Sequence, residues 1–395
     1  MDRSNPPPPW LVAWIGIAFL LRLIWVLHLP ATDSYLASLP DQREYLELGR
    51  NLLHGNGLFF HDPRFDADLF AYRTPGYPLF VAFCGGSIRI IRIAQAGVDA
   101  SSVLAVYLLA RRWLSPRRSL FAAATIALNP LLIYFSGLVL AETLFTALLV
   151  WSMVTITSPA TEGFGLLSLG GAVLVRPSAL LLPVFLAGMN PVGRGAYHLR
   201  RAILAAAVVL LLLVPWAWRN HTRLGAWIWT TTNGGITLYD GFNPNADGSS
   251  DQSFVARMPQ LQMMGEVQRS RYLGHLAREF IEQHPLQAIR LAFYKLLRTW
   301  SPIPLSREYG HEARYVLIGL FYTLPFFVMV LAGLASDRLP MAAKVLLLLP
   351  ALYITVVHAA SVGSIRYRVP ADVPMAVIAA AGVGWDGRQR QPLAR

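Results

Sequence analysis

Apolar residues occur in long runs separated by short polar gaps. The first run, Trp10 to Leu29, has 20 residues, enough to cross a hydrocarbon core of about 30 Å. Later runs cover residues 90–110, 119–136, 143–158, 164–188, 202–218, 313–335, 341–360 and 369–384, and Arg176-Pro177 divides 164–188 into two short helices. The pattern predicts an all-α, polytopic integral membrane protein with about ten spans.

Two long polar stretches, 30–89 and 219–312, interrupt the apolar pattern and predict two large loops. Within 41–57, Tyr45, Leu48 and Leu52 recur at helical spacing, which predicts an amphipathic helix on the membrane surface. Residues 286–300 repeat this pattern and predict a second interfacial helix. The segment 230–248 is rich in Gly, Asn and Asp, and predicts either an ordered loop over a site or a solvent loop.

Composition agrees with the membrane assignment, because 55% of the residues are apolar and only 14% are charged, against roughly 25% charged in soluble domains. The net charge of +12 does not indicate nucleic-acid binding, because the basic residues fill short gaps between apolar runs. The first run predicts an uncleaved signal anchor; a cleavable signal peptide is the alternative. A single cysteine, Cys84, excludes an internal disulfide.

The basic gaps also orient the chain. They contain Arg111, Arg112, Arg117 and Arg118; Arg194, Arg200 and Arg201; Arg338 and Lys344; and Arg388, Arg390 and Arg395. The positive-inside rule places them on the cytoplasmic side together with both termini. The stretches 30–89 and 219–312 are then expected on the outer face, where any active site would lie. This distribution disfavours a transporter, which would line a central path with charges.

The first polar stretch contains the first candidates for chemistry. Asp41 stands at the start of the amphipathic helix with Glu44 three residues later. One interpretation is a helix cap, and the other is a general base that takes a proton from an acceptor hydroxyl. Arg73, before the turn at Pro75-Gly76, could bind an anionic headgroup bidentately or simply reach the interface. Arg22 and Arg176 lie within apolar runs, and each could bind a lipid phosphate or be structural.

Together these motifs resemble the glycosyltransferase C superfamily, and within it family 39, the group of protein O-mannosyltransferases and aminoarabinose transferases. The resemblance rests on the Asp-x-x-Glu-Tyr helix, the Tyr-Arg-x-Pro-Gly-Tyr-Pro turn and five later segments. These are NPLLIYFSGLVLAET (129–143), VRPSALLLP (175–183), WAWRNHTRLGAW (216–227), YLGHLAREFIEQHP (272–285) and IRYRVPADVP (365–374). The resemblance implies the glycosyltransferase C fold as a single transmembrane domain over 1–395, without the large soluble domain that follows the last span in some relatives.

The resemblance also implies roles for individual residues. Asp41 matches the essential acidic residue of the first outer loop, and Glu142 matches a second acidic position, where the aminoarabinose transferases carry Asp. Arg73 falls where those enzymes have a phosphate-binding lysine. Tyr72 replaces an acidic residue before that lysine, so no metal or acid role is carried over. Arg366 and Arg368 match a basic pair before the last span and, with Arg73, are expected to bind the donor phosphate.

The chemistry at an outer face agrees with these roles, because a sugar donor there must arrive activated and tethered to lipid. A polyprenyl-phosphate carrier meets both needs, and arginines would stabilise the charge that develops on the departing phosphate. One carboxylate, Asp41, with Glu44 and Glu142 as further candidates, then suffices for a single inverting displacement. No cofactor is required, and a role for a divalent metal is left open; the histidines lack the spacing of a zinc site.

Four residues are further candidates for substrate contact: Tyr45 and Tyr72 near the proposed base, and Asn243 and Asp247 in the second loop, which could bind sugar hydroxyls or make turns. The predicted function is transfer of a sugar from a polyprenyl-phosphate carrier to an acceptor hydroxyl at the outer face of the bacterial inner (plasma) membrane. The acceptor could be a lipid, a glycan or a protein. The alternatives are an oligosaccharide ligase or polymerase that uses a diphosphate-linked donor, and a transporter or flippase.

Overall fold

The computed structural model describes residues 8–37, 40–189, 196–305 and 312–384, so Arg3, Arg194, Arg388, Arg390 and Arg395 lie outside the described residues. The α-helices are α1 (Pro9–His28), α2 (Asp33–Ala37), α3 (Pro40–Leu53), α4 (Gly76–Phe83), α5 (Ile88–Ala110), α6 (Pro116–Ala127), α7 (Pro130–Ser136), α8 (Glu142–Ile156), α9 (Glu162–Val175), α10 (Leu182–Gly188), α11 (Ala196–Leu224), α12 (Asn233–Gly241), α13 (Glu266–Gln283), α14 (Pro285–Trp300), α15 (Ala313–Ile318), α16 (Leu324–Ala335), α17 (Met341–Ala359) and α18 (Ile365–Gly382). Two short strands, β1 (Phe60–Asp62) and β2 (Ala67–Leu69), pair antiparallel. The predicted all-α class is therefore confirmed.

Five helical segments of the described chain are long and apolar enough to cross a membrane. They are Pro9–His28, Ile88–Ala110, Ala196–Leu224, Ala313–Ala335 and Met341–Ala359; α6 and α7 together make a sixth, bent by 49°. The predicted pair of short helices around Arg176 is present as α9 and α10, which like α8 are apolar but shorter than a full span. The protein is a multi-pass membrane protein, although these six segments do not confirm the count of about ten.

Helix α18 forms the centre of the bundle rather than a lipid-facing span. It packs against α5, α6, α8, α14, α16 and α17, and every residue from Arg368 to Ala381 is buried. Two prolines lie inside it, Pro370 and Pro374, and most of its buried apolar residues are alanine, valine or isoleucine. Because other helices cover it on all sides, α18 holds its first turn, with Arg366, in a fixed place.

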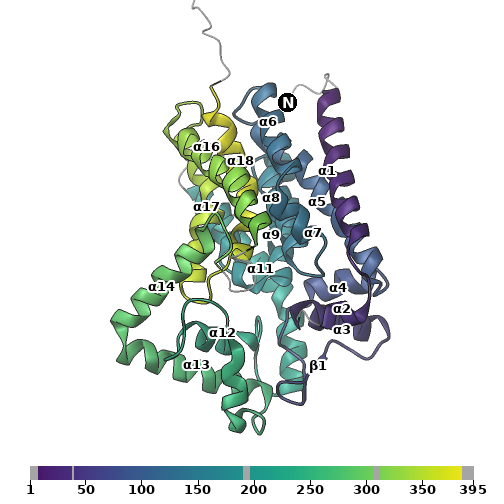
Figure 1. Cartoon of the computed structure of the whole chain (residues 1–395), viewed down its shortest axis with the longest axis vertical. Helices are drawn as coiled ribbons and strands as arrows, with labels where there is room; N and C mark the ends of the chain where they lie inside the picture. Colours follow the sequence, from purple (N-terminus) through teal and green to yellow (C-terminus); the bar gives the residue numbers. More distant parts are fainter. Residues whose placement is uncertain (1–7, 38–39, 190–195, 306–311, 385–395) are drawn as a thin grey trace, which may run out of the picture.

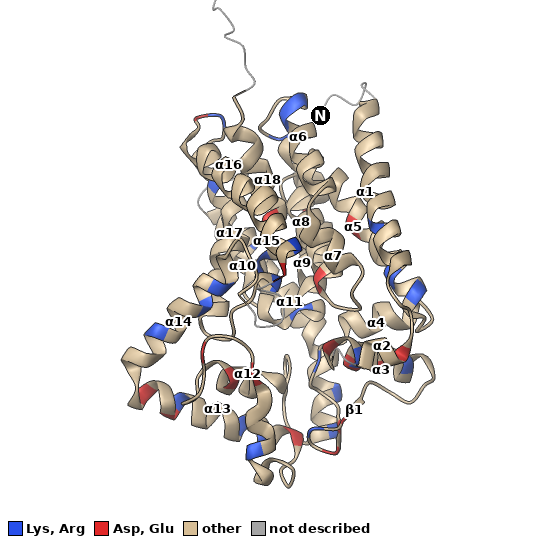
Figure 2. Ribbon diagram, viewed as in Figure 1, with Lys and Arg blue, Asp and Glu red and all other residues tan. Residues whose placement is uncertain are grey.

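Both long polar stretches lie at one end of this bundle (Figure 1). Helices α2, α3 and α4 with the hairpin come from 30–89, and α12 and α13 come from 219–312, while α1 begins at the opposite end. Charged residues are sparse along the helices of the bundle and more frequent toward its loop end (Figure 2). The sequence placed both polar stretches on one face, and the structure brings them to one end.

The first polar stretch folds as the periodicity predicts. Helix α3 buries Tyr45 and Leu48, and the chain leaves it through Gly55 and Gly57, both with positive φ. Helix α4 follows the predicted turn, and its first residue, Gly76, lies so close to α9 that a Cβ would come within 2.6 Å of the Leu174 backbone. A glycine is therefore required where α4 meets α9.

The second stretch differs in one place from the predicted loop over 230–248, because residues 233–241 form helix α12. Its glycines permit close packing: a Cβ on Gly235 would lie 1.8 Å from the carbonyl oxygen of Ser270 in α13. The predicted helix over 286–300 is present as α14, with Leu286, Ile289 and Phe293 exposed along one stripe. Its position at the membrane interface stays a prediction.

Arg22 does not reach outward from α1 but turns into the bundle. It is ion-paired with Asp99 of α5 and donates to the carbonyl oxygens of Ile126 and Ala127 at the break between α6 and α7, at 3.2 and 2.9 Å. Proline at position 130 has no N–H for the Ile126 carbonyl. The Ile126 carbonyl oxygen accepts from the Asn129 amide at 3.3 Å instead. The Leu131 amide donates to Asn129 Oδ1, so Arg22 supplies the Ala127 carbonyl oxygen with a donor inside the membrane-spanning region.

Candidate active site

Asp41 lies at the centre of the ion pairs that join the first loop to the bundle. It stands in the first turn of α3, inside the helix rather than before it as a cap would. Its Oδ1 accepts from Arg73 Nη2 at 2.5 Å, and its Oδ2 accepts from Arg366 Nη1 at 2.5 Å. The carboxylate is thus held between two guanidinium groups, one 32 and the other 325 residues further along the chain, while 37% of its side chain stays exposed.

Arg73 is fixed by a second carboxylate and two aromatic rings. Its Nε and Nη2 donate to Glu44 Oε2 at 2.9 and 2.5 Å, and the Glu44 side chain is only 3% exposed. The guanidinium carbon lies 5.2 Å from the ring centroids of both Tyr45 and Tyr72. These contacts orient the guanidinium so that one edge faces Asp41.

On the bundle side, Arg366 continues the series of ion pairs. Its Nε donates to Glu142 at the start of α8, and Arg176 Nη1 lies 3.6 Å from the same carboxylate oxygen. Arg176 faces the ring of Tyr367, whose centroid is 5.2 Å from the guanidinium carbon. Asp41, Glu44, Arg73, Glu142, Arg176 and Arg366 therefore form one cluster of alternating charge, referred to below as the ion-pair cluster.

The two carboxylates of α3 differ in their electrostatics. Burial raises the pKa of Asp41, but the attraction of Arg73 and Arg366 outweighs it and holds the pKa well below its usual range. Burial dominates at Glu44 and raises its pKa despite Arg73. Burial likewise raises the pKa of the Tyr72 hydroxyl, so that tyrosine stays protonated. Asp41 is thus ionised in this arrangement, and only the loss of an arginine contact would make it a stronger base.

Three other predicted site residues do not join the ion-pair cluster. Arg368 is fully buried, donates to the carbonyl oxygen of Ser301 at 2.5 Å and lies 3.8 Å from Asp372. Asn243 bonds to the carbonyl oxygen of Tyr239 and the amide of Asn245. Asp247 accepts from the amide and hydroxyl of Ser249. The contacts of Asn243 and Asp247 are those of turn-forming side chains, which was the alternative to binding of sugar hydroxyls.

Arg368 falls outside the ion-pair cluster because of helix geometry. Residues advance by about 100° around an α-helix, so positions two apart point to roughly opposite sides. Arg366 faces Asp41 and Glu142, whereas Arg368 faces the carbonyl oxygens at the end of α14. A matched basic pair in the sequence therefore contributes one arginine to the ion-pair cluster.

The sequence did not indicate the role of Arg64, which lies beside the ion-pair cluster. It binds Asp62 at 2.5 Å, lies 3.5 Å from Glu44 and donates to the Tyr72 hydroxyl at 3.2 Å. Asp62 ends β1 and Arg64 lies in the turn before β2. This hairpin has no strong periodicity in its sequence, so no pattern predicts a role for either residue. The short spacing between two opposite charges was the only available signal.

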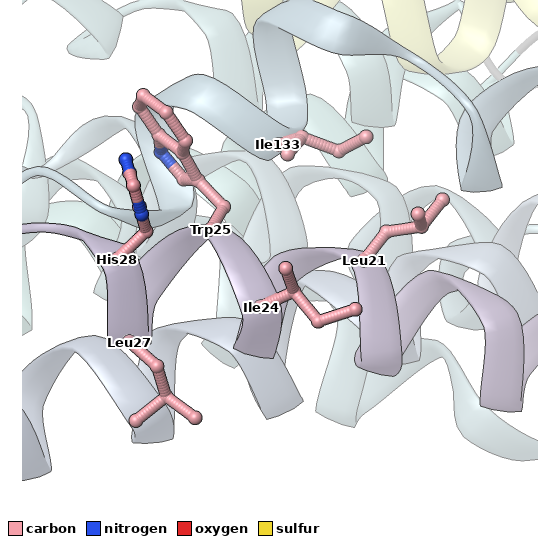
Figure 3. A pocket seen from close by; sticks show the side chains of 6 residues that line it. All are labelled: Leu21, Ile24, Trp25, Leu27, His28 and Ile133. Carbon is pink, nitrogen blue, oxygen red and sulfur yellow. The ribbon is translucent and has the colours of Figure 1, made fainter.

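Two hollows flank the helices. An apolar one on the face of α1 and α7 has no carboxylate or guanidinium among its lining residues, which are Leu21, Ile24, Trp25, Leu27, His28 and Ile133 (Figure 3). A narrow apolar cleft between α8, α10 and α17 ends at Arg176, with Phe145, Leu182 and Ile354 among its walls. Only the second hollow reaches the ion-pair cluster.

The polar atoms of the cluster include two without a hydrogen-bond partner within the described residues, Arg176 Nη1 and Glu142 Oε2. Both atoms are buried, and because each lacks a hydrogen bond, each can bind a polar group of a ligand. Within the same described ranges, no group of three or more His, Cys, Asp or Glu side chains is arranged to hold a metal ion.

Comparison of sequences identifies relatives for half of the chain. No family model matches it. The undecaprenyl phosphate-alpha-4-amino-4-deoxy-L-arabinose arabinosyl transferase of Pectobacterium carotovorum is 29% identical over 228 residues, which cover 52% of this chain and 40% of the relative. The matched region thus spans about two fifths of the length of the curated relatives. The predicted resemblance to aminoarabinose transferases is confirmed.

Comparison of structures extends over nearly the whole chain. The oligosaccharyltransferase of Archaeoglobus fulgidus in its apo form has a TM-score of 0.56 and 15% identity, covering 94% of this chain and 50% of that one. The archaeal oligosaccharyltransferase AglB from Archaeoglobus fulgidus, in complex with an inhibitory peptide and a dolichol-phosphate, has a TM-score of 0.54 and 13% identity, covering 95% of this chain and 50% of that one. At this identity the likeness concerns the fold, and it confirms the predicted glycosyltransferase C fold.

Proposed function

We propose that the protein is a membrane glycosyltransferase that moves a sugar from a polyprenyl-phosphate carrier to an acceptor hydroxyl. The observation that carries this proposal is the position of Asp41 between Arg73 and Arg366, with 37% of its side chain open to incoming groups. The partial match to arabinosyl transferases whose name includes undecaprenyl phosphate supports this donor class.

The donor phosphate takes the place that the Asp41 carboxylate occupies in this structure. Two oxygens of Asp41 accept from Arg73 and Arg366 at 2.5 Å each, and a phosphate offers the same pair of acceptor atoms. Arg176 Nη1, which is buried, lies 3.6 Å from Glu142 Oε1 and makes no hydrogen bond within the described residues, adds a third donor.

Displacement of Asp41 by phosphate makes it a base. Without its arginines, the burial that raises its pKa acts unopposed. The acceptor oxygen then attacks the anomeric carbon, the bond from that carbon to the phosphate oxygen breaks, and Asp41 takes the acceptor proton. The polyprenyl phosphate leaves with one more negative charge, which Arg73, Arg366 and Arg176 stabilise. Glu142 and Glu44 hold these arginines in place, and the step requires no cofactor.

We place this site on the extracytoplasmic face of the bacterial inner membrane. Both polar stretches lie toward one end of the bundle, and the ion-pair cluster includes Asp41, Glu44 and Arg73 of the first stretch. The basic gaps of the sequence, such as 111–118, border the other ends of the spans. Tyr45 and Tyr72, whose rings flank Arg73, would border the sugar. The acceptor is a lipid, glycan or protein hydroxyl.

Transfer assays with purified protein test the proposal. Radiolabelled polyprenyl-phosphate and polyprenyl-diphosphate sugars are offered in separate reactions with detergent-solubilised envelope lipids, glycans and peptides. We expect transfer or slow donor hydrolysis with the monophosphate donors. Turnover of diphosphate donors alone would favour the ligase or polymerase, and no turnover with either, together with lipid or sugar transport in vesicles, would favour the transporter.

A further inference from the structure

The segment that precedes Arg73 is bonded through its backbone to the second polar stretch. The amides of Phe70 and Ala71 donate to the two carboxylate oxygens of Glu266, at 2.7 and 2.9 Å. The Ala71 carbonyl oxygen accepts from the amide of Thr232 at 2.9 Å, and the Phe70 carbonyl oxygen accepts from Arg219 Nη1 at 2.6 Å. All four backbone polar groups of these two residues are therefore satisfied by α11, α13 and the start of α12.

Glu266 is buried, and its carboxylate also accepts from the Thr232 hydroxyl at 2.5 Å. A buried carboxylate is costly unless hydrogen bonds compensate it. Bonds from backbone amides to a charged acceptor are short and about twice as strong as neutral ones. This concentration of strong bonds on two residues of a loop locates that part of the backbone firmly.

The two helices that carry or follow the partners of Ala71, α12 and α13, pack closely together. Helix α12 follows Thr232 and packs on α13 so closely that a Cβ on Gly235 would lie 1.8 Å from the Ser270 carbonyl oxygen. Glu266 is the first residue of α13. Thr232 and Glu266 therefore keep a fixed separation. The Thr232 amide bonds to the Ala71 carbonyl oxygen and Glu266 bonds to the Ala71 amide, so together they fix the position of this residue.

We infer that Glu266 is a positioning residue for the donor-phosphate site and acts through Arg73. Ala71 precedes Arg73 by two residues, which spans about 7 Å of extended chain, and Tyr72 between them packs its ring under the Arg73 guanidinium. A shift of the Ala71 backbone thus moves the guanidinium that grips the phosphate. The second polar stretch sets donor affinity without contacting the donor. This inference rests on the proposed function.

The test is Glu266→Gln, which keeps the shape of the side chain but presents an NH2 group to one of the two amides. We expect the KM for the polyprenyl-phosphate donor to rise about tenfold, with kcat changed less, because Arg73 holds the phosphate before and during the reaction. The affinity for undecaprenyl phosphate, measured directly in detergent, should fall by the same factor. In a double-mutant cycle with Arg73→Lys, the two effects on affinity should not add, because both act on one guanidinium.

The matched control is Glu162→Gln, at the far end of α9 from Arg176. Glu162 is also ion-paired, to Arg201, and accepts from the Tyr197 hydroxyl at 2.8 Å. The control removes the same charge, so we expect lower thermal stability and unchanged donor affinity. If Glu266→Gln does not fold, Thr232→Val, which removes one bond to Glu266, should weaken undecaprenyl phosphate binding in the same direction.

An affinity of Glu266→Gln equal to that of the wild type, or effects that add fully to those of Arg73→Lys, would overturn the inference. Binding and transfer measured on the wild-type protein distinguish failure of this inference from failure of the proposed function. If it binds undecaprenyl phosphate but transfers no sugar, the proposed reaction fails while the binding cycle still tests Glu266. If it does not bind undecaprenyl phosphate, both fail.

Discussion

Replacement of Asp41 by asparagine should weaken catalysis and strengthen donor binding. Asparagine is similar in size but carries no charge, and its amide can offer only one acceptor oxygen. In the wild-type protein the donor phosphate must replace two carboxylate contacts, to Arg73 and Arg366 at 2.5 Å each. Asp41→Asn removes this internal competitor and cannot accept the acceptor proton.

The size of the affinity gain follows from those two contacts. A hydrogen bond to a charged group is worth about 1.5–3 kcal/mol, and asparagine keeps at most one such bond. Because 37% of the Asp41 side chain is exposed, solvent recovers much of that energy, and we take about 1.4 kcal/mol, a tenfold gain in affinity. Transfer should fall about 100-fold to 10,000-fold, the usual value of general-base catalysis.

The measurement pairs binding of undecaprenyl phosphate in detergent with single-turnover transfer at saturating donor. Asp33→Asn is the control, because it removes a carboxylate from an exposed pair with Arg50 and should change neither quantity. Unchanged or weaker binding in Asp41→Asn would show that Asp41 does not occupy the phosphate position. Transfer near the wild-type rate would show that the base lies elsewhere, with Glu44 and Glu142 next in line.

Three further outcomes are expected. Arg366→Lys keeps the charge but cannot bridge two carboxylates, so it should lower transfer at least about tenfold. Arg368→Lys should lower thermal stability and leave transfer nearly unchanged. Equal losses of transfer in the two variants would contradict the conclusion that Arg366 alone of this pair belongs to the ion-pair cluster. Burial lowers the pKa of Lys295 to about 7, below about 10.4 in an unfolded chain. Between these pH values the unfolded state binds more protons than the folded state, so Tm in detergent should rise from pH 7 to pH 9. Lys295→Met should flatten this rise, and an equal slope in the variant would refute the assignment. In intact cells, Asp247→Cys should react with an impermeant thiol reagent and Ser115→Cys should not, and the reverse pattern would invert the topology.

The part of the ion-pair cluster that lies in one loop could be predicted from local pattern. Asp41, Glu44 and Arg73 occur within 33 residues, and helical periodicity placed the two acids at the start of one helix. Nothing in that stretch shows that Arg366 would complete it from 325 residues away. Its place came from resemblance to a family, because pairing across a bundle depends on helix packing and not on spacing.

The sequence did not show which way a side chain points around its helix, or which helix is covered by others. The sequence grouped Arg366 with Arg368, but the turn of α18 separates them. It treated 369–384 as a span like the others and did not show that α18 is enclosed by other helices. Hydropathy measures how apolar a segment is, and it gives the same value for a helix in lipid and one covered by protein.

The partners of Arg22 also determine an order of events during synthesis. An arginine near the middle of an apolar helix costs about 2.5–3.5 kcal/mol on insertion, and Asp99 and the Ala127 carbonyl group are made 77 and 105 residues later. While the ribosome is still translating that interval, the Arg22 guanidinium has neither of these partners and can donate only within its own helix, to the Ala18 carbonyl oxygen. Its final place is therefore reached only after α5 and the α6–α7 elbow have inserted. A more apolar first helix would insert sooner and leave Asp99 buried without a cation.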